Sequence, residues 1–178
     1  MNPSPRTPSS TRTLMSEVMT PNDANFLGKV FGGRILALMD LCAYVTAARF
    51  SGEICVTAGF DKVDFHEPIE VGEVVSLAGF VSYVGRSSIE VTIEVHAENV
   101  LKGIKRHTNT ARITMVAIKG DRPVEVPRLL CETREEKILF LLGRFRRENR
   151  AEYAEERRKR LEELEAAGDP ELDRLLEE

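Results

Sequence analysis

This 178-residue sequence has no tryptophan, few cysteines and no uninterrupted long apolar run. Cys42, Cys55 and Cys131 are odd in number and form no C-x-x-C pair, which disfavours a secreted disulfide framework and favours the reducing cytosol. The apolar stretch at residues 35–48 is shorter than the ~18 to 20 residues of a membrane span. We therefore expect a cytoplasmic protein that does not insert into membranes.

An excess of positive charge is also missing, since the formal net charge is -4. No basic stripe interleaved with aromatic residues occurs, which disfavours nucleic acid as a partner but leaves an anionic ligand open through local basic patches. His66, His96 and His107 lack metal-ligand spacing. No metal and no cofactor are expected, and the cysteines are interpreted as small buried hydrophobic residues.

The composition, with 42% hydrophobic and 30% charged residues, indicates one soluble folded domain with extensions. Residues 1–12 are rich in Pro, Ser and Thr and hold no apolar segment, so we predict a disordered tail rather than a signal peptide. Their lack of acidic residues leaves a transit peptide as a less favoured alternative. The domain itself is expected at residues 13–130, followed by a helical extension at 131–178.

One apolar helix and several strands account for the expected domain. The helix is predicted from Gly32 to Arg49, with its end near Gly52. A short strand precedes it at 13–19, and alternation of apolar and polar residues is clearest at 88–98. Further strands are expected at 54–65, 74–84 and 108–118. This order predicts an α+β fold in which an antiparallel sheet wraps a central helix.

The C-terminal extension is expected to be helical. Thr133 and Glu136 have the spacing of a capping box at its start. Beyond residue 144, blocks of basic and acidic residues alternate, with Glu155–Lys159 and Glu156–Arg160 as candidate i,i+4 pairs. A solvated helix is favoured over a coiled coil because sustained apolar heptad positions are missing. A last short helix is predicted from residue 169.

Asp40 is the most informative residue, because it places a carboxylate inside the apolar helix. A buried carboxylate is costly unless something pairs with it or uses it. One interpretation is structural, in which Asp40 caps a neighbouring loop or pairs with an arginine, such as Arg34 or Arg49. The other is catalytic, because Asn25 lies upstream and the Gly32–Gly33 pair opens the helix with N–H groups that can bind an anion. Carboxylate, amide and helix N-terminus together suggest hydrolysis of an acyl compound.

Helix geometry sharpens the catalytic interpretation. Gly33 and Asp40 lie on nearly the same face, but seven residues at 1.5 Å per residue separate them by ~10 Å. One thioester carbonyl cannot contact the helix N-terminus while its attacking water is bound to Asp40 of the same helix. Two antiparallel helices across a two-fold axis would bring the two groups together, which predicts active sites shared within a dimer.

Several motifs occur in order along the chain. They are N-x-x-G-x-x-F-G-G-x-I-L-x-x-M-D at residues 25–40, V-T-A at 56–58, D-K-V-D-F at 61–65, P-I-x-V-G-E-V-V at 68–75, G-R-S-S at 85–88, T-M-V at 114–116, V-P-x-L at 126–129 and E-T-x-E-E-K at 132–137. Together they resemble the hotdog-fold acyl-CoA thioesterases, specifically the bacterial acyl-CoA hydrolases and the cytosolic animal enzymes, over about residues 13 to 145. Two departures are Cys131, where a proline is usual, and Met115, where an aromatic residue is usual.

The resemblance implies thioester hydrolysis of acyl-CoA to free CoA and a carboxylic acid. Asp40 would be the general base or the nucleophile, Asn25 of the partner chain would orient water or the carbonyl, and the Gly33 N–H, with that of Gly32, would form the oxyanion hole. It also implies homodimers, often assembled as trimers of dimers, and no cofactor.

The resemblance also places the turn at residues 85–88 near the CoA phosphates. Arg86 would then contact a phosphate, and Ser87 and Ser88 would donate hydrogen bonds, although a plain hairpin turn also explains these residues. Two alternatives to hydrolysis remain. A hotdog hydratase or dehydratase would use His66, and a non-enzymatic acyl-CoA sensor would only bind. The sensor is disfavoured because no recognisable DNA-binding segment precedes Thr13.

Overall fold

The structure, a computed structural model, describes residues 4–61, 63, 65 and 67–177. The chain divides into two compact units, residues 1–140 and 141–178. The first unit contains the 3₁₀ helices η1 (Ser9–Thr11) and η2 (Pro21–Asp23), the helix α1 (Gly32–Ser51), and the strands β1 (Thr13–Val18), β2 (Ile54–Phe60), β3 (Val74–Val84), β4 (Ser88–Asn99), β5 (Ile104–Lys119) and β6 (Arg122–Pro123).

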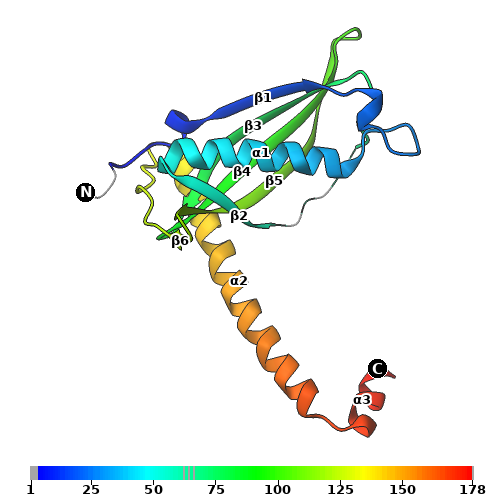
Figure 1. Ribbon diagram of the computed structural model, residues 1–178, viewed down its shortest axis with the longest axis vertical. Coiled ribbons are helices and arrows are strands. Elements are labelled where there is room, and N and C mark those ends of the chain that lie inside the picture. Colours follow the sequence, from blue (N-terminus) through cyan, green and yellow to red (C-terminus); the bar gives the residue numbers. More distant parts are fainter. Residues whose placement is uncertain (1–3, 62, 64, 66, 178) are drawn as a thin grey trace. The chain divides into compact units, whose positions relative to one another are not determined.

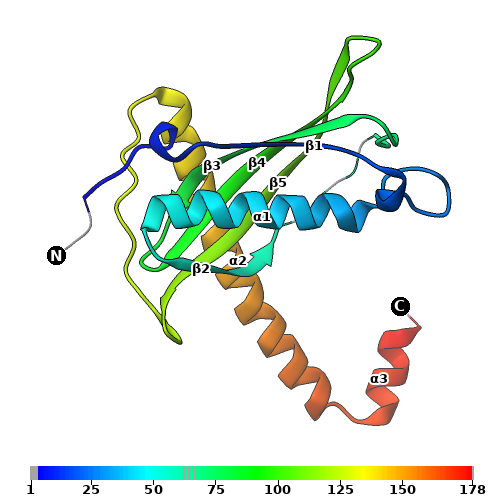
Figure 2. The same cartoon turned by 45° about the horizontal axis from the view of Figure 1, so that its top comes forward.

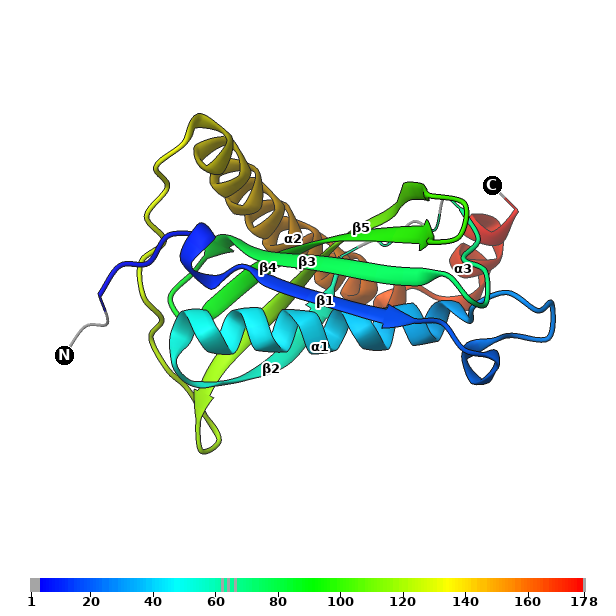
Figure 3. The same ribbon diagram turned by 90° about the horizontal axis from the view of Figure 1, so that it is seen from above.

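All strand pairs in the sheet are antiparallel, in the order β1-β3-β4-β5-β2, with β6 added to β5. Figure 1 shows this sheet curved around α1, and Figures 2 and 3 show the same helix lying along the sheet in two further views. The predicted α+β architecture, a central helix wrapped by an antiparallel sheet, is therefore confirmed. β2 and β1 form its two edges.

The helix α1 begins and ends where the sequence predicts. Gly52 terminates it in the left-handed conformation (φ 75°), and its N–H donates to the carbonyl of Ala48 at 2.8 Å. The face toward the sheet is buried through residues at helical spacing. These are Ile35, Leu38, Met39, Cys42, Ala43, Thr46, Ala47 and Phe50.

The opposite face of α1 is apolar as well, but a single chain does not cover it. Leu41 is 51% exposed and Tyr44 is 40% exposed, and Ala37 lies one turn before Leu41 on the same stripe. A helix with apolar residues on both faces is expected to be buried on both. In the described part of one chain, the sheet covers one face of α1, and nothing covers the other.

A glycine allows α1 to approach the middle of the sheet closely. A Cβ atom on Gly79 of β3 would lie 2.6 Å from the Thr46 hydroxyl and 2.9 Å from the Cys42 sulfur. The Thr46 hydroxyl itself donates to the carbonyl of Cys42 at 2.7 Å, which satisfies the one fully buried hydroxyl of the helix. The lack of a side chain at Gly79 therefore sets the distance between helix and sheet.

Two strand boundaries differ from the prediction. β2 ends at Phe60 rather than residue 65, and β5 begins at Ile104 rather than residue 108. Residues 104–107 pair with 96–99 across the β4–β5 hairpin, after a register shift beside Val95. The irregular alternation that this shift creates conceals the start of β5 in the sequence.

Residues 4–12, where the sequence predicts a disordered tail, include η1 and pair with the chain before the last long helix. The Arg6 N–H donates to the carbonyl of Arg128 at 3.0 Å, and the Leu130 N–H donates back to the Arg6 carbonyl at 2.9 Å. The Arg6 guanidinium also donates to the carbonyl of Arg49 in the last turn of α1. A cation at a helix C-terminus interacts favourably with the helix dipole, so this segment caps α1.

Two helices form the C-terminal region, α2 (Arg134–Ala166) and α3 (Asp169–Leu176). The predicted capping box is present, because the Glu136 N–H donates to the Thr133 hydroxyl at 3.2 Å and the Glu136 carboxylate accepts the Thr133 N–H at 3.1 Å. The boundary between compact units falls after residue 140, ten residues beyond the predicted end of the domain. The first turns of α2 thus belong to the first unit.

The charged part of α2 forms ion pairs along its own surface. Lys159 pairs with Glu155 as predicted, with 3.6 Å between nitrogen and oxygen. Arg160 pairs with Glu163 at 3.2 Å instead of with Glu156. Exposed pairs of this kind contribute little to stability, and they are consistent with a solvated helix.

A salt bridge fastens the chain between β2 and β3 to the sheet. Arg106 on β5 contacts both carboxylate oxygens of Glu73, at 2.7 and 2.8 Å, and donates to the Pro68 carbonyl at 2.8 Å. The Glu67 carboxylate lies 2.9 Å from the Arg106 Nε. These hydrogen bonds hold the pKa of Glu73 below its ordinary value, and Glu73 is only 4% exposed.

This pairing predicts a specific loss of stability in acid. A carboxyl group whose pKa is lowered by folding contributes stability that is fully present above its unfolded pKa, about 4.3 for glutamate, and disappears as the pH falls through the lower folded value. We expect the free energy of unfolding, measured by urea titration between pH 3 and 7, to fall less steeply below pH 4.3 in Glu73→Gln. An unchanged slope would show that Glu73 is not responsible.

Candidate active site

Asp40 is half-buried near the middle of α1 and accepts a hydrogen bond from the neighbouring strand. The Thr57 hydroxyl on β2 donates to the Asp40 Oδ1 at 2.5 Å. Neither predicted arginine partner pairs with it: Arg34 binds Asp23 and Glu17, and Arg49 donates to the Thr13 hydroxyl at 3.3 Å. The predicted pairing of Asp40 with an arginine is therefore wrong, and the carboxylate, which is half-buried rather than buried, contacts the neighbouring strand through Thr57.

Thr57 is a site residue that the sequence analysis quoted in a motif but did not select. It lies on the edge strand β2, immediately before a register shift between Thr57 and Gly59. Its hydroxyl also lies 3.5 Å from the sulfur of Met115 on β5. Threonine is common in strands, so only its contact with Asp40 distinguishes it.

Asn25 organises its own loop through its side-chain oxygen. The Oδ1 atom accepts the N–H of Leu27 at 2.9 Å and that of Lys29 at 3.2 Å, and the Asn25 N–H donates to the Lys29 carbonyl at 2.7 Å. Gly28 completes the loop in the left-handed conformation (φ 74°). Because two N–H donors occupy the oxygen, the side-chain NH₂ group is the part of Asn25 left to donate to a ligand.

The N-terminus of α1 is open to a ligand. Phe31 is the N-cap residue and makes no side-chain capping hydrogen bond, so the first N–H groups of the helix, at Gly32 and Gly33, have no acceptor among the residues described. A Cβ atom on Gly33 would lie 2.3 Å from the Phe31 ring, while one on Gly32 would meet only ordinary contacts with Phe65 at 3.5 Å. Gly33 therefore needs to be glycine for Phe31 to keep this position.

Asn25 and Gly33 line one cavity of about 560 Å³, together with Asp23, Phe31 and Arg34. Asp40 is not among its lining residues and contacts Thr57 instead. The uninterrupted course of α1 leaves Gly33 and Asp40 ~10 Å apart along the axis. Asn25 and Gly33 thus line the same cavity, and Gly33 lies about two helical turns from Asp40, as the helical spacing predicts.

The predicted CoA residues lie on a turn at the other end of α1 from this cavity (Figure 1). The Gly85 N–H donates to the Ser88 carbonyl at 2.8 Å and closes the turn. Arg86 is exposed, and its side chain has no partner among the described residues. Ile89, next to Ser88, shares a row of the sheet with Met115 and Thr57. Within one chain, the turn therefore lies nearer to Asp40 than to Gly33.

Two of the three cysteines are buried, as the sequence predicts, whereas Cys131 is partly exposed. Cys42 and Cys55 are buried, and burial raises the pKa of both thiols, which keeps them protonated. His96 and His107 stack edge to face across β4 and β5, and no group of three metal-ligating side chains occurs in the described part of the chain. His66, which a dehydratase would use, lies outside the described residues.

None of the helices described is long and apolar enough to cross a membrane.

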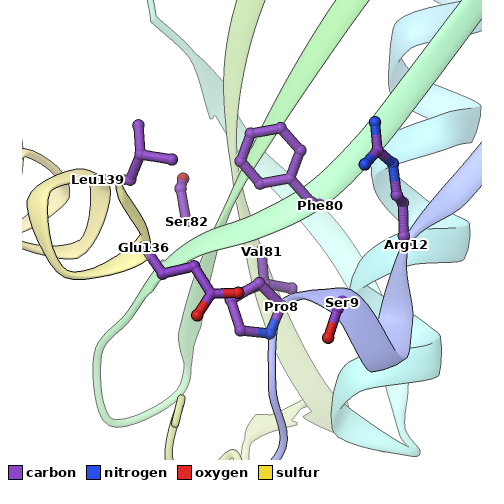
Figure 4. A pocket seen from close by; sticks show the side chains of 8 residues that line it. All are labelled: Pro8, Ser9, Arg12, Phe80, Val81, Ser82, Glu136 and Leu139. Atoms are coloured by element: carbon purple, nitrogen blue, oxygen red, sulfur yellow. The ribbon is translucent and has the colours of Figure 1, made fainter. Parts of the chain in front are cut away.

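A second cavity, of about 200 Å³, lies between the N-terminal segment, β3 and the start of α2 (Figure 4). Its walls include Pro8, Phe80 and Leu139, and Ser82 and Glu136 contribute polar groups. None of the predicted site residues lines it. The larger cavity at the α1 N-terminus is therefore the candidate active site.

A sheet curved around one helix, with an open helix N-terminus beside an amide, is the arrangement of a hotdog-fold enzyme domain. The thioesterase superfamily model matches residues 27–104. The acyl-CoA thioester hydrolase YkhA of Bacillus subtilis, itself described as uncharacterized, is 38% identical over 120 residues, covering 67% of this chain and 70% of that protein. The chain therefore belongs to the thioesterase superfamily.

Solved structures agree on the fold. A crystal structure of an apo-hexameric acyl-CoA thioesterase matches with a TM-score of 0.81 at 38% identity, covering 85% of this chain and 97% of that chain. The acyl-CoA hydrolase of Staphylococcus aureus, solved with butyryl coenzyme A, coenzyme A and coenzyme A disulfide, matches with a TM-score of 0.79 at 29% identity, covering 89% and 98%. The predicted hotdog fold is thereby confirmed.

The Staphylococcus aureus enzyme has also been solved with an asparagine, an aspartate or a threonine replaced by alanine. In that chain the asparagine precedes the aspartate by 15 positions, and the threonine follows the aspartate by 17. Asn25, Asp40 and Thr57 have the same two separations here.

Proposed function

We propose that this protein hydrolyses acyl-CoA thioesters to free CoA and carboxylic acids at sites shared between two copies of the chain. The observation that carries the proposal is the division of the candidate residues. Asn25 and Gly33 line one cavity, whereas Asp40 is held by Thr57 about two helical turns away. Each chain then supplies two half-sites, and neither is complete alone.

Asp40 is the group that drives the attack on the thioester. As a general base, its carboxylate removes a proton from water while the water oxygen bonds to the carbonyl carbon; the C–S bond then breaks, and the CoA thiolate takes the proton from the Asp40 carboxyl group. As a nucleophile, its carboxylate oxygen bonds to the carbonyl carbon, the C–S bond breaks to release the CoA thiolate, and water then hydrolyses the resulting mixed anhydride to free Asp40 and the carboxylic acid. Thr57 occupies the Oδ1 atom and fixes the carboxylate, which leaves Oδ2 for either role.

The other half-site stabilises the substrate carbonyl. The uncapped N–H of Gly33, with that of Gly32, donates to the oxygen as it becomes negatively charged, and the helix dipole adds to this effect. The NH₂ group of Asn25 is a donor, so it orients the attacking water or the carbonyl by giving a hydrogen bond.

The uncovered apolar stripe of α1 supports this helix as the surface to which the second copy binds. Leu41 and Tyr44 are exposed on the face that lies away from the sheet, in the helical turn that follows Asp40. Antiparallel packing of two α1 helices buries both stripes and places Gly33 of one opposite Asp40 of the other. The hexamers known among similar enzymes support further assembly of such dimers into a trimer of dimers.

The CoA moiety is proposed to bind along the turn at residues 85–88. Arg86 has a free, exposed guanidinium among the described residues, which suits a phosphate, and Ser87 and Ser88 offer hydroxyl groups beside it. Because this turn lies nearer to Asp40 than to Gly33 of the same chain, one chain would supply both the residues that bind the CoA phosphates and the catalytic carboxylate.

Substitution of either Asp40 or its hydrogen-bond donor Thr57 should reduce thiol release from a panel of acyl-CoA esters of different chain length. We expect kcat to fall by ~10²–10⁴ in Asp40→Asn, the range of general base catalysis, and by ~10–100 in Thr57→Val, because a hydrogen bond to a charged group is lost. Wild-type protein that binds acyl-CoA but releases no thiol would contradict the proposal and favour a sensor. Water addition to crotonyl-CoA instead would indicate a hydratase.

The two glycines at the start of α1 offer a matched comparison. We expect Gly33→Ala to lower kcat by ~10²-fold or more, because its methyl group displaces Phe31 and disturbs an oxyanion donor. Gly32→Ala adds the same methyl group at ordinary contact distance and should change kcat only about twofold. Equal losses in thiol-release assays would show that the crowding at Gly33 is irrelevant to activity.

Mixing two inactive variants tests the shared site directly. A dimer of one Asp40→Asn chain and one Asn25→Ala chain has one intact site, so free exchange of equal amounts should restore about a quarter of the wild-type sites. Subunit exchange is verified by native mass spectrometry. Exchange without recovered thiol release would place both residues in a site within one chain.

A further inference from the structure

The loop that carries Asn25 is joined to the N-terminus of α1 by a three-residue ion network. The Arg34 Nε lies 2.9 Å from the Asp23 Oδ1, and a terminal nitrogen of Arg34 donates to the Glu17 carboxylate on β1. The Asp23 Oδ2 accepts both the N–H and the hydroxyl of Thr20 at 2.7 Å. Arg34 therefore contacts two carboxylates, and both oxygens of the Asp23 carboxylate accept hydrogen bonds.

The network connects the two groups that the proposed mechanism places on the thioester. Arg34 directly follows Gly33 in α1, and Asp23 precedes Asn25 by two residues. Both Arg34 and Asp23 line the same cavity as Gly33 and Asn25. The Asp23 carbonyl also accepts the Phe31 N–H at 2.8 Å. The pair thus bridges the two walls of the cavity.

The hydrogen bonds inside the loop determine its shape but not its position on the protein. Those bonds join Asn25 to Leu27 and Lys29, all within the loop. The Lys29 ammonium pairs with Glu70 on the far side, and this pair is more than 40% exposed on each partner. Arg34 and Asp23, whose side chains are 31% and 12% exposed, form the side-chain link on the α1 side.

The charge on Arg34 is compensated within the protein, which argues against a role in binding CoA phosphates. Two carboxylates, those of Glu17 and Asp23, accept its hydrogen bonds in two different directions. The Thr20 hydroxyl and N–H, with Arg34, hold the pKa of Asp23 below its ordinary value, so the pair stays ionised at neutral pH. A planar guanidinium can hold both partners at once, and an ammonium cannot do so in the same geometry.

We propose that Arg34 is a positioning residue, which acts through Asp23 to hold the Asn25 amide at a fixed place relative to the Gly33 N–H. Arg34 itself does not contact the reacting atoms. The inference rests on the proposed thioesterase function, because that function has Gly33 stabilise the substrate carbonyl and Asn25 orient the same carbonyl or the water that attacks it. Displacement of a catalytic group by about 1 Å is enough to cost ~10²-fold in rate.

A double-mutant cycle between Arg34→Gln and Asn25→Ala tests the inference in the full chain. We expect Arg34→Gln to lower kcat for acyl-CoA hydrolysis about 10-fold or more, with KM changed less than about threefold, because substrate binding is retained while geometry is lost. In the Asn25→Ala background the same substitution should have almost no further effect. Additive losses in kcat would overturn the inference.

Two further variants separate positioning from general destabilisation. Arg34→Lys keeps the charge but not both hydrogen bonds, and it should recover only part of the loss. Lys29→Gln removes the ion pair on the far side of the same loop and should leave kcat within about twofold, because exposed pairs contribute little. An equal loss in Lys29→Gln would show that any weakening of the loop has this effect, which also overturns the inference.

A readout that is independent of catalysis distinguishes failure of this inference from failure of the proposed function. The side-chain NH₂ signal of Asn25, assigned by its absence in Asn25→Ala, reports the position of the amide by nuclear magnetic resonance. We expect it to shift or broaden in Arg34→Gln and to stay unchanged in Lys29→Gln. If wild-type protein releases no thiol, the proposed function fails, whereas an unmoved Asn25 signal in Arg34→Gln overturns the positioning role alone.

Discussion

The rigidity of α1 is the constraint on which the rest of the structure depends. A continuous helix rises 1.5 Å per residue, so its open N-terminus at Gly33 and its carboxylate at Asp40 cannot reach the same carbonyl. Gly79 lets the sheet approach one face of this helix, and the other face keeps an apolar stripe uncovered. The packing that holds the fold together therefore leaves the site divided, and a second copy of the chain is the partner that would complete it.

Each half of the site is organised by a different kind of interaction. Asp40 is held by one neutral donor, the Thr57 hydroxyl, on the edge strand β2. The Asn25 loop is held on the α1 side by the partly buried ion pair of Arg34 with Asp23, whereas the Lys29–Glu70 pair on its far side is exposed. A hydroxyl orients the carboxylate without neutralising it, which suits a general base, whereas ion pairs with several hydrogen bonds suit the fixing of a loop. The chemistry of each half agrees with the role proposed for it.

Much of this fold follows from local patterns in the chain. The left-handed Gly52 ends α1, Thr133 and Glu136 begin α2, and the alternation along β4 predicts a strand there, although Glu90 and Thr92 on its polar face are buried as well. Helical spacing alone separates Gly33 from Asp40. Patterns are weaker where pairing is irregular, as at the start of β5, and where a polar segment is tied down by partners far along the chain, as Arg6 is by Arg128.

By itself, the sequence determined the order of the elements, the caps, the placement of a carboxylate within an apolar helix and the distance between the two halves of the site. These properties depend on residues close together along the chain, and helix and strand periodicity expresses them directly. Only the tertiary structure decided that Thr57 rather than an arginine contacts Asp40, and that Arg34 joins Asp23 and Glu17. Such contacts depend on strand register and loop placement, which bring together residues that local periodicity does not relate.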